Sequence, residues 1–163
     1  LNALAKELVF EPFGMTSTSY VWRDDFESRF AFGNDKNGNQ MDLSRRPHNA
    51  HAAWSLYSTS KDYANFVARL LDTSNSVASE MFSAQIAVTE EIVWGLGWGL
   101  QSTEPNRSFW HWGSNSGYRA YVVGYPVEGI AVVVLSNSES LFKLIEKTVE
   151  VTIGGDLPSF HWF

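Results

Sequence analysis

The 163-residue chain contains no cysteine, which excludes disulfide bonds, thiol catalysis and cysteine-ligated metal sites. It has no basic run, and its 18 acidic residues outnumber its 12 lysines and arginines. It therefore lacks the positive surface that a phosphate backbone or an anionic membrane needs, and we expect no nucleic-acid partner. No apolar run reaches the roughly 18 residues of a membrane span, and no charged-then-apolar leader is present.

The first ten residues, LNALAKELVF, carry apolar positions at helical spacing and are typical of the last turns of a helix. Pro12 and Gly14 would end that helix. The sequence begins at Leu1 without an initiator Met. We therefore expect this chain to be a fragment of a longer protein, although its length suits a single domain.

Two later segments carry the one-sided apolar stripe of an amphipathic helix. Residues 60–72 are one of them, and a shorter helix is expected at residues 77–85. The other stripe follows a capping box, Ser136-x-x-Glu139, and is ended by Gly154-Gly155. Its apolar face is expected to contain Leu141, Leu144, Ile145, Thr148 and Val149.

The carboxy-terminal half is rich in β-branched and aromatic residues and predicts strands. The expected strands are residues 94–101, 107–113, 118–125 and 129–136. The turn at residues 126–129 should pair the last two antiparallel. The last strand, IAVVVL, is apolar at every position and suits a central strand. Upstream, residues 34–49 predict a long polar loop with a hairpin tip at Asn37-Gly38, and such loops often act as lids.

Ser58-x-x-Lys61 and Tyr63-x-Asn65 spell two of the three signatures of serine β-lactamases and penicillin-binding enzymes. On a helix, however, Lys61 lies about 160° and Asn65 about 200° from Tyr63, so the three side chains cannot converge on one substrate atom. The pattern Thr59-x-x-Asp62 in the same stretch instead predicts the start of a helix. Ser58 as a nucleophile stays as the alternative hypothesis.

Three segments resemble one family in their order and spacing. VFEPFGMTSTSY (9–20) resembles a "PLGM-T-T" segment, and AAWSLYSTSKDYANF (52–66) resembles "GGLYST-D-F". HWGSNSGYRAYVVGYPVEGIAVVVLSNS (111–138) resembles an "H-G-x-x-G" strand, a hairpin and a final strand. The chain thus resembles the serine β-lactamase-like hydrolases, which include class C β-lactamases, D-alanyl-D-alanine carboxypeptidases, D-aminopeptidases and esterases.

This resemblance implies an α/β fold of the β-lactamase/transpeptidase type, an antiparallel sheet covered by helices. Residues 1–163 would be the carboxy-terminal part of a single domain. Two strands, the nucleophile helix and both the Ser-x-x-Lys and Tyr-x-Asn motifs would lie upstream of Leu1. The resemblance further implies an extracytoplasmic location and no cofactor.

The implied function is that of a serine hydrolase acting on amide, ester or β-lactam carbonyls through an acyl-enzyme, with this portion inactive alone. Its partners would be a small-molecule or peptide substrate, and the chain could pair with itself or with its missing half through the face that half would cover. The alternative is a non-catalytic binding or regulatory module of the same fold.

The motif His111-Trp112-Gly113 stands where the family's Lys-Thr-Gly is expected. The resemblance implies that Gly113 lets substrate approach the backbone and that the N–H of Ser114 serves an oxyanion hole. His111 would hydrogen-bond the proton relay or a substrate carboxylate, and Trp112 and Asn115 would contact substrate. Histidine carries less fixed positive charge than lysine, which weakens a β-lactamase interpretation and suits the D-peptidase and esterase members. The other interpretation of His111 is an edge-strand histidine bonded to a carbonyl.

The remaining patterns favour structural roles. His48 and His51 lie in a polar loop without an evident third ligand, so we predict no metal site. Gly95-x-Gly97-x-Gly99 lies in a strand-like stretch and does not open a helix, so it does not predict a phosphate loop. The aromatic tail at residues 160–163 is expected to pack against neighbouring elements.

One further departure concerns the loop before the Ser58 segment. Trp54-Ser55 stands where the family has small glycines, so the adjacent loop could be narrowed or closed.

Overall fold

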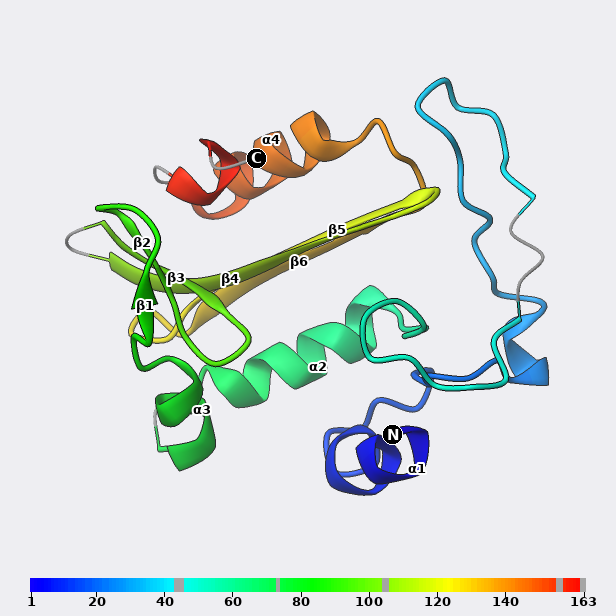
Figure 1. The fold of residues 1–163 in the computed structure, drawn as a ribbon, viewed down its shortest axis with the longest axis horizontal. Helices are drawn as coiled ribbons and strands as arrows, with labels where there is room; N and C mark the ends of the chain where they lie inside the picture. Colours follow the sequence, from blue (N-terminus) through cyan, green and yellow to red (C-terminus); the bar gives the residue numbers. More distant parts are fainter. Residues whose placement is uncertain (43–45, 73, 104–105, 155–156, 162–163) are drawn as a thin grey trace.

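A computed structural model describes residues 1–42, 46–72, 74–103, 106–154 and 157–161. Its central element is a six-stranded antiparallel sheet in the order β1-β2-β3-β4-β5-β6. The strands are β1 (Ile86–Ala87), β2 (Ile92–Trp94), β3 (Gly99–Thr103), β4 (Asn106–Asn115), β5 (Tyr118–Tyr125) and β6 (Ile130–Ser136). Figure 1 shows the sheet nearly edge-on between helices.

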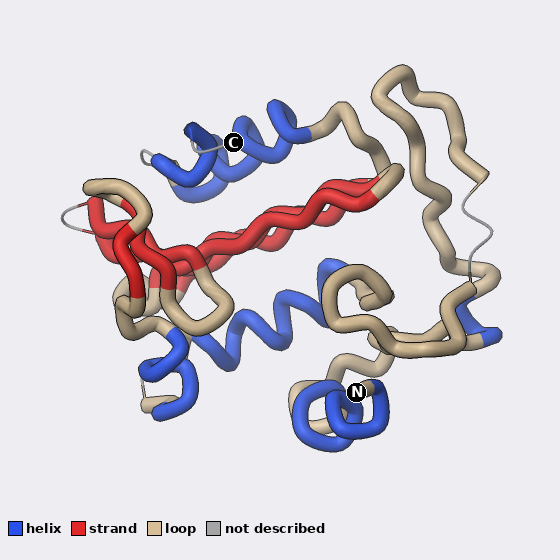
Figure 2. The backbone as a smooth tube through the Cα atoms, in the orientation of Figure 1, coloured by secondary structure: helices blue, strands red, loops and turns tan. Residues whose placement is uncertain are grey.

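The helices are α1 (Asn2–Ala5), which continues as a π-helix (Lys6–Phe10), α2 (Ser60–Leu70), α3 (Ser76–Met81) and α4 (Phe142–Ile153). Two 3-10 helices span Asp24–Phe26 and Pro158–His161. In Figures 1 and 2, α4 and the carboxy-terminal 3-10 helix lie on one face of the sheet, and α2 lies on the other. The expected antiparallel sheet covered by helices is confirmed. No helix in the described part of the chain is long and apolar enough to cross a membrane.

The core on the α4 face is built from large side chains of β4 and β5. Trp110, Tyr121 and Val123 are buried there against Ile145 and Val149 of α4. The Tyr121 hydroxyl also shares a 2.7 Å hydrogen bond with the Ser159 hydroxyl of the carboxy-terminal 3-10 helix. This bond attaches the end of the chain to the middle of the sheet.

Phe160 packs on the ring of Tyr121, with 4.5 Å between the ring centroids. The expected packing of the aromatic tail is therefore confirmed at Phe160, whereas residues 162–163 lie outside the described part of the chain.

The core on the α2 face uses the alternate residues of the same strands. Phe109 and Val122 pack there with Leu100, against Val67 and Leu70 of α2. The expected apolar stripe of this helix is confirmed, and so is its start, because the Thr59 hydroxyl accepts a hydrogen bond from the Asp62 backbone N–H at 3.1 Å.

The prediction of one strand over residues 94–101 was wrong. The chain turns between Trp94, which ends β2, and Gly99, which begins β3. The Gly95 N–H donates to the Trp98 carbonyl at 2.8 Å, and Gly97 adopts φ +78°, a conformation that side chains other than glycine rarely take. Gly95 and Gly97 therefore lie in the hairpin turn between β2 and β3.

The prediction of a capping box at Ser136-x-x-Glu139 was also wrong. Helix α4 begins only at Phe142 and has no side-chain cap. The Glu139 carboxylate instead accepts a hydrogen bond from the Gly117 N–H at 3.0 Å, across the β4–β5 turn. Leu144, expected on the buried face, is exposed. Gly154 ends the helix with φ +67°, as expected, and Gly155 lies outside the described residues.

β6 is covered on both faces, by α2 and α4, but it stands last in the sheet order. The apolar run IAVVVL therefore has the double covering of a central strand. In the described part of the chain, however, β6 pairs only with β5.

The expected amino-terminal helix is present, and it ends before Pro12 and Gly14. The tip at Asn37-Gly38 is likewise confirmed: the Gly38 N–H donates to the Asp35 carbonyl at 3.1 Å, and the Asp35 N–H to the Asn39 carbonyl at 2.9 Å.

Replacing Gly99 by Ala should destabilise the fold, because the new Cβ would lie 2.4 Å from the buried ring of Trp110. We expect the free energy of unfolding in urea to fall by about 1–3 kcal/mol. Gly113→Ala is the matched control, because its Cβ would meet only the Ala120 methyl at an ordinary 3.6 Å. Equal losses in the two variants would contradict this account of the packing.

Candidate functional site

β4 extends beyond the end of its neighbour β3, which leaves one backbone edge of β4 without a pairing to β3. β3 pairs with β4 only from Asn106 to Trp110, whereas β5 pairs with β4 as far as Asn115. Residues 111–115 therefore have β5 on one side and no pairing with β3 on the other. The sequence motif expected to form the site lies in this stretch.

His111 faces the α2 side of the sheet. Its cross-strand partner on β5 is Val122, which belongs to the α2-face core, and its ring centroid lies 6.2 Å from that of Trp98 in the same core. The imidazole is nevertheless exposed. Its position above the end of β3 leaves it accessible to a ligand.

The His111 Nδ1 lies 2.8 Å from the carbonyl oxygen of Trp112. Because a carbonyl oxygen only accepts, Nδ1 carries the hydrogen of this bond and Nε2 is the nitrogen left to receive a proton from another group. The interpretation of His111 as a histidine bonded to a carbonyl is thus met at one nitrogen. The second nitrogen stays available for chemistry.

The strand pairing locates the N–H of Ser114. In an antiparallel strand the N–H and C=O of one residue point to the same edge, and residues two apart share that edge. Asn115 and Tyr118 close the two-residue β4–β5 turn, so the backbone groups of Asn115 and Gly113 point to β5. The Trp112 carbonyl and the Ser114 N–H therefore point to the open edge beyond the end of β3.

Gly113 and Asn115 line a hollow of about 880 Å³ on the α2 face. Its opposite wall includes Ser58 and Thr59 before α2, and the adjoining strands contribute Ala120 and Leu135. The structure thus brings His111, Gly113 and Asn115 to one face of the sheet, with the Ser114 N–H at its edge.

Trp112 does not join them. Its cross-strand partner is Tyr121 in the α4-face core, and its ring centroid lies 6.2 Å from that of Phe142 in α4. A substrate contact through this ring stays a prediction, but the ring is on the opposite face of the sheet from His111.

The geometry around Ser58 favours the capping interpretation over a nucleophile. The Thr18 hydroxyl donates to the Asp62 carboxylate at 2.8 Å, so its 2.9 Å contact with the Ser58 hydroxyl is a bond that Ser58 donates. Lys61 is exposed. Ser58 therefore has no base beside it in these contacts.

Because it lies about 200° from Tyr63 on the helix, Asn65 was expected to point to water, but the structure differs. It is half-buried, and its amide nitrogen lies 3.4 Å from the Gly14 carbonyl oxygen, which it approaches as a donor. Asp62 was expected only to favour the start of the helix, but it is buried and also accepts the Ser17 N–H at 2.7 Å. These residues fasten the segment before the long loop to α2.

Residues 31–34 hydrogen-bond both to the end of the β4–β5 hairpin and to the segment that follows β6. The Tyr118 hydroxyl donates to the Ala31 carbonyl at 2.9 Å, and the Asn137 amide donates to the Phe32 carbonyl at 2.9 Å. The Glu139 N–H donates to the Asn34 carbonyl at 3.1 Å. The sequence did not predict these hydrogen bonds, because no local signal links residues 87 and 105 positions apart.

The Trp54-Ser55 departure has a physical role in the structure. Ser55 is buried, accepts the His51 N–H at 2.9 Å and donates to the Tyr20 carbonyl at 2.7 Å. The Trp54 ring stacks on the His51 ring at 4.8 Å and lines the hollow. Among the described residues, no group of three His, Asp or Glu could hold a metal ion.

An antiparallel sheet between helices, with a glycine-containing motif at the free edge of one strand, defines the class of this fold. The family description "Beta-lactamase" matches residues 1–149. This chain therefore belongs to the Beta-lactamase family. No curated protein sequence matches the chain.

Three solved structures share the fold. The octameric penicillin-binding protein homologue from Pyrococcus abyssi has a TM-score of 0.75 and 22% identity, over 95% of this chain and 38% of that one. The β-lactamase/D-alanine carboxypeptidase from Pseudomonas syringae has 0.76 and 17%, over 93% and 53%. The D-stereospecific amidohydrolase from a Streptomyces species has 0.74 and 17%, over 95% and 49%. The chain thus spans about half the length of these structures or less.

Replacing Asp62 by Ala should lower the free energy of unfolding by about 2–3 kcal/mol, because the Ser17 N–H and the Thr18 hydroxyl lose a charged acceptor in a buried place. Denaturant unfolding measures the change. Asp24→Ala, at an exposed position, is the control and should change stability by less than about 0.5 kcal/mol. Indistinguishable values would show that Asp62 does not anchor this segment.

Proposed function

We propose that this chain is the carboxy-terminal portion of a serine hydrolase that acts on amide, ester or β-lactam carbonyls through an acyl-enzyme. The observation that carries the proposal is the open edge of β4, where His111 is exposed and Ser114 has no pairing with β3, while Gly113 between them in the strand lines the hollow. The family membership makes serine hydrolysis the chemistry that fits this edge.

In this proposal the nucleophile comes from a segment upstream of Leu1 that carries the Ser-x-x-Lys motif. That segment would sit in the hollow lined by Gly113 and Asn115, next in the chain to Ser114 on both sides. The serine attacks the carbonyl, the lysine and the upstream tyrosine transfer protons, and water then hydrolyses the acyl-enzyme. The oxyanion is held by the Ser114 N–H and the amide of the nucleophile itself.

His111 makes the D-peptidase and esterase classes fit better than β-lactam hydrolysis. Its Nδ1–H is directed to the Trp112 carbonyl, so Nε2 is an acceptor in the neutral imidazole, whereas a lysine in its place would be a charged donor. Two of the similar structures carry D-alanine carboxypeptidase and D-stereospecific amidohydrolase in their names. They support a substrate with a D-configured centre.

We propose that a strand of the same domain, from upstream of Leu1, pairs with the open edge of β6. β6 has no charged residue, no proline and no bulge along its pairing with β5, so nothing on it opposes the addition of a strand. Self-association through this edge would be the alternative, and the Pyrococcus homologue is an octamer. We also propose an extracytoplasmic location, on the family resemblance alone.

Exposure to a fluorophosphonate and, separately, to a penicillin tests the proposed function, with intact mass as the measurement. We expect no adduct on the 163-residue chain and a stoichiometric adduct on the longer gene product that includes the sequence before Leu1. An adduct on the short chain that disappears in Ser58→Ala would overturn the assignment of the nucleophile upstream. A longer product that never acylates would favour a binding module.

In the longer protein, Ser114→Pro should reduce the rate of acylation by about 10²–10³-fold, because proline removes the N–H that we place in the oxyanion hole. Ser114→Ala keeps that N–H and should acylate at nearly the normal rate. Circular dichroism checks that both variants fold. A Ser114→Pro protein that folds and acylates normally would place the oxyanion elsewhere.

A further inference from the structure

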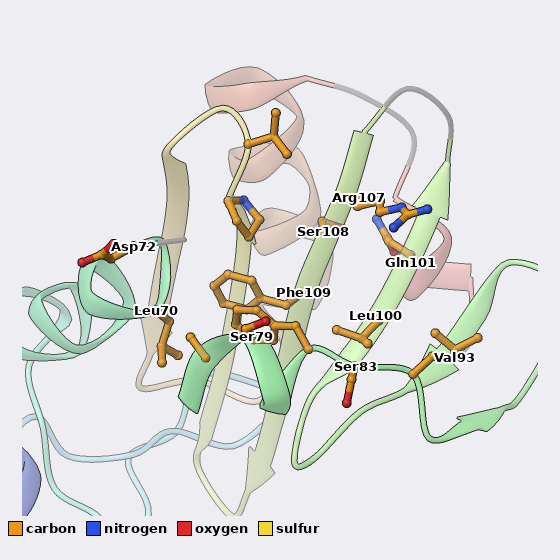
Figure 3. A pocket seen from close by; sticks show the side chains of 15 residues that line it. Leu70, Asp72, Ser79, Ser83, Val93, Leu100, Gln101, Arg107, Ser108 and Phe109 are labelled. Carbon is orange, nitrogen blue, oxygen red and sulfur yellow. The ribbon is translucent and has the colours of Figure 1, made fainter. Parts of the chain in front are cut away.

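A second pocket, of about 600 Å³, lies on the α2 face near the other end of β4 (Figure 3). Its floor is the face-to-face pair Phe82 and Phe109, whose ring centroids are 4.3 Å apart with 13° between the ring planes. Leu70, Ala78, Val93 and Leu100 add apolar walls. None of its lining residues belongs to the hollow beside Gly113.

The volume and composition of this pocket are those of a small-molecule site. Ligand pockets typically enclose roughly 300–1,000 Å³ and are mostly apolar, with a few polar groups that orient the ligand. At the mouth, the turn after β5 adds Pro126 and Val127, and the Val127 side chain is 84% exposed. An apolar surface thus runs from solvent to the aromatic floor.

Arg107 supplies the charge at one end of the pocket. It lies two residues before Phe109 on β4, so its side chain leaves the same face of the sheet, roughly 6.6 Å further along the strand. The guanidinium is exposed, and no carboxylate in the described part of the chain pairs with it. Figure 3 shows Arg107 on the side of the pocket away from Asp72.

Asp72 does not compete for this charge. Its carboxylate accepts the Ser74 hydroxyl at 2.6 Å and the Ser74 N–H at 2.9 Å. These bonds lower the pKa of Asp72, so the group stays ionised and committed to its own turn. The cation that a ligand would meet is Arg107.

We propose that this pocket binds an apolar monocarboxylic acid, such as a medium-chain fatty acid. The apolar body lies between Phe82, which covers the buried Phe109 ring, and the Pro126–Val127 turn, and the carboxylate bonds to the guanidinium of Arg107, which suits a planar anion. Trp98 contacts both the floor of the pocket and the candidate site. The Trp98 ring centroid lies 5.0 Å from that of Phe109 and 6.2 Å from that of His111.

Titration of the ¹⁵N-labelled 163-residue chain with sodium octanoate, followed by ¹H–¹⁵N NMR, tests the proposal. We expect saturable shifts at Ala78, Leu100 and Phe109 and weaker binding by about tenfold in Arg107→Gln, which loses the charge-assisted bond. Arg69→Gln removes another exposed arginine and is the matched control. 1-Octanol, which has the same chain length without the carboxylate, should bind wild type and Arg107→Gln equally.

Shifts that do not saturate, or that fall outside the pocket, would overturn the site. Equal octanoate affinity in Arg107→Gln and Arg69→Gln would overturn the role of Arg107 and with it the class of ligand. Neither variant alters a buried residue, so both should fold, and their unbound spectra verify this.

Discussion

The alternation of side chains along β4 is the constraint on which the rest of the structure depends. Phe109, His111 and Gly113 face α2, while Trp110 and Trp112 face α4, so one strand supplies both cores and the candidate site. A slip of one residue would exchange the two sets. His111 would then point into the α4 core, and the Ser114 N–H would point at β5.

Glycines opposite the largest rings hold that register. A Cβ on Gly99 would meet Trp110 at 2.4 Å, and a Cβ on Gly124 would meet Phe109 at 2.4 Å. Each ring therefore fits only where its neighbouring strand offers a glycine directly across the ladder. The packing of the cores and the direction of the site groups are fixed by the same contacts.

Local pattern predicted the elements that carry local signals. The cap at Thr59, the stripe of α2, the β5–β6 turn and the Gly154 stop depend on neighbouring residues, and each was found where the sequence indicated. The strand predicted at residues 94–101 failed because of a local turn at Gly95 and Gly97, whereas two other errors arose where a distant partner used the same residues. Glu139 was predicted to cap a helix, but it accepts a hydrogen bond from the Gly117 N–H. Asp62 was predicted only as part of a helix start, but it also accepts hydrogen bonds from Ser17 and Thr18.

The strand that carries His111-Trp112-Gly113 could be predicted from the sequence, but the face of each side chain could not. The period-two rule separates Trp112 from His111 only once the strand is known to run straight through the motif, and the open edge depends on where β3 stops. The hydrogen bonds of Ala31 with Tyr118 and of Phe32 with Asn137 join positions 87 and 105 apart, for which a single sequence carries no signal.

The candidate site consists mainly of backbone groups of β4, and the fold is shared with structures that are only 14–22% identical to this chain. The N–H at Ser114 and the bare backbone at Gly113 do not depend on a large side chain, so they survive wherever the strand keeps its register. The side chain at 111, by contrast, sets the charge beside that edge, and a histidine there carries less fixed positive charge than a lysine. In the hydrolase that we propose, the backbone edge would therefore hold the reacting carbonyl, and residue 111 would influence which acyl groups suit it.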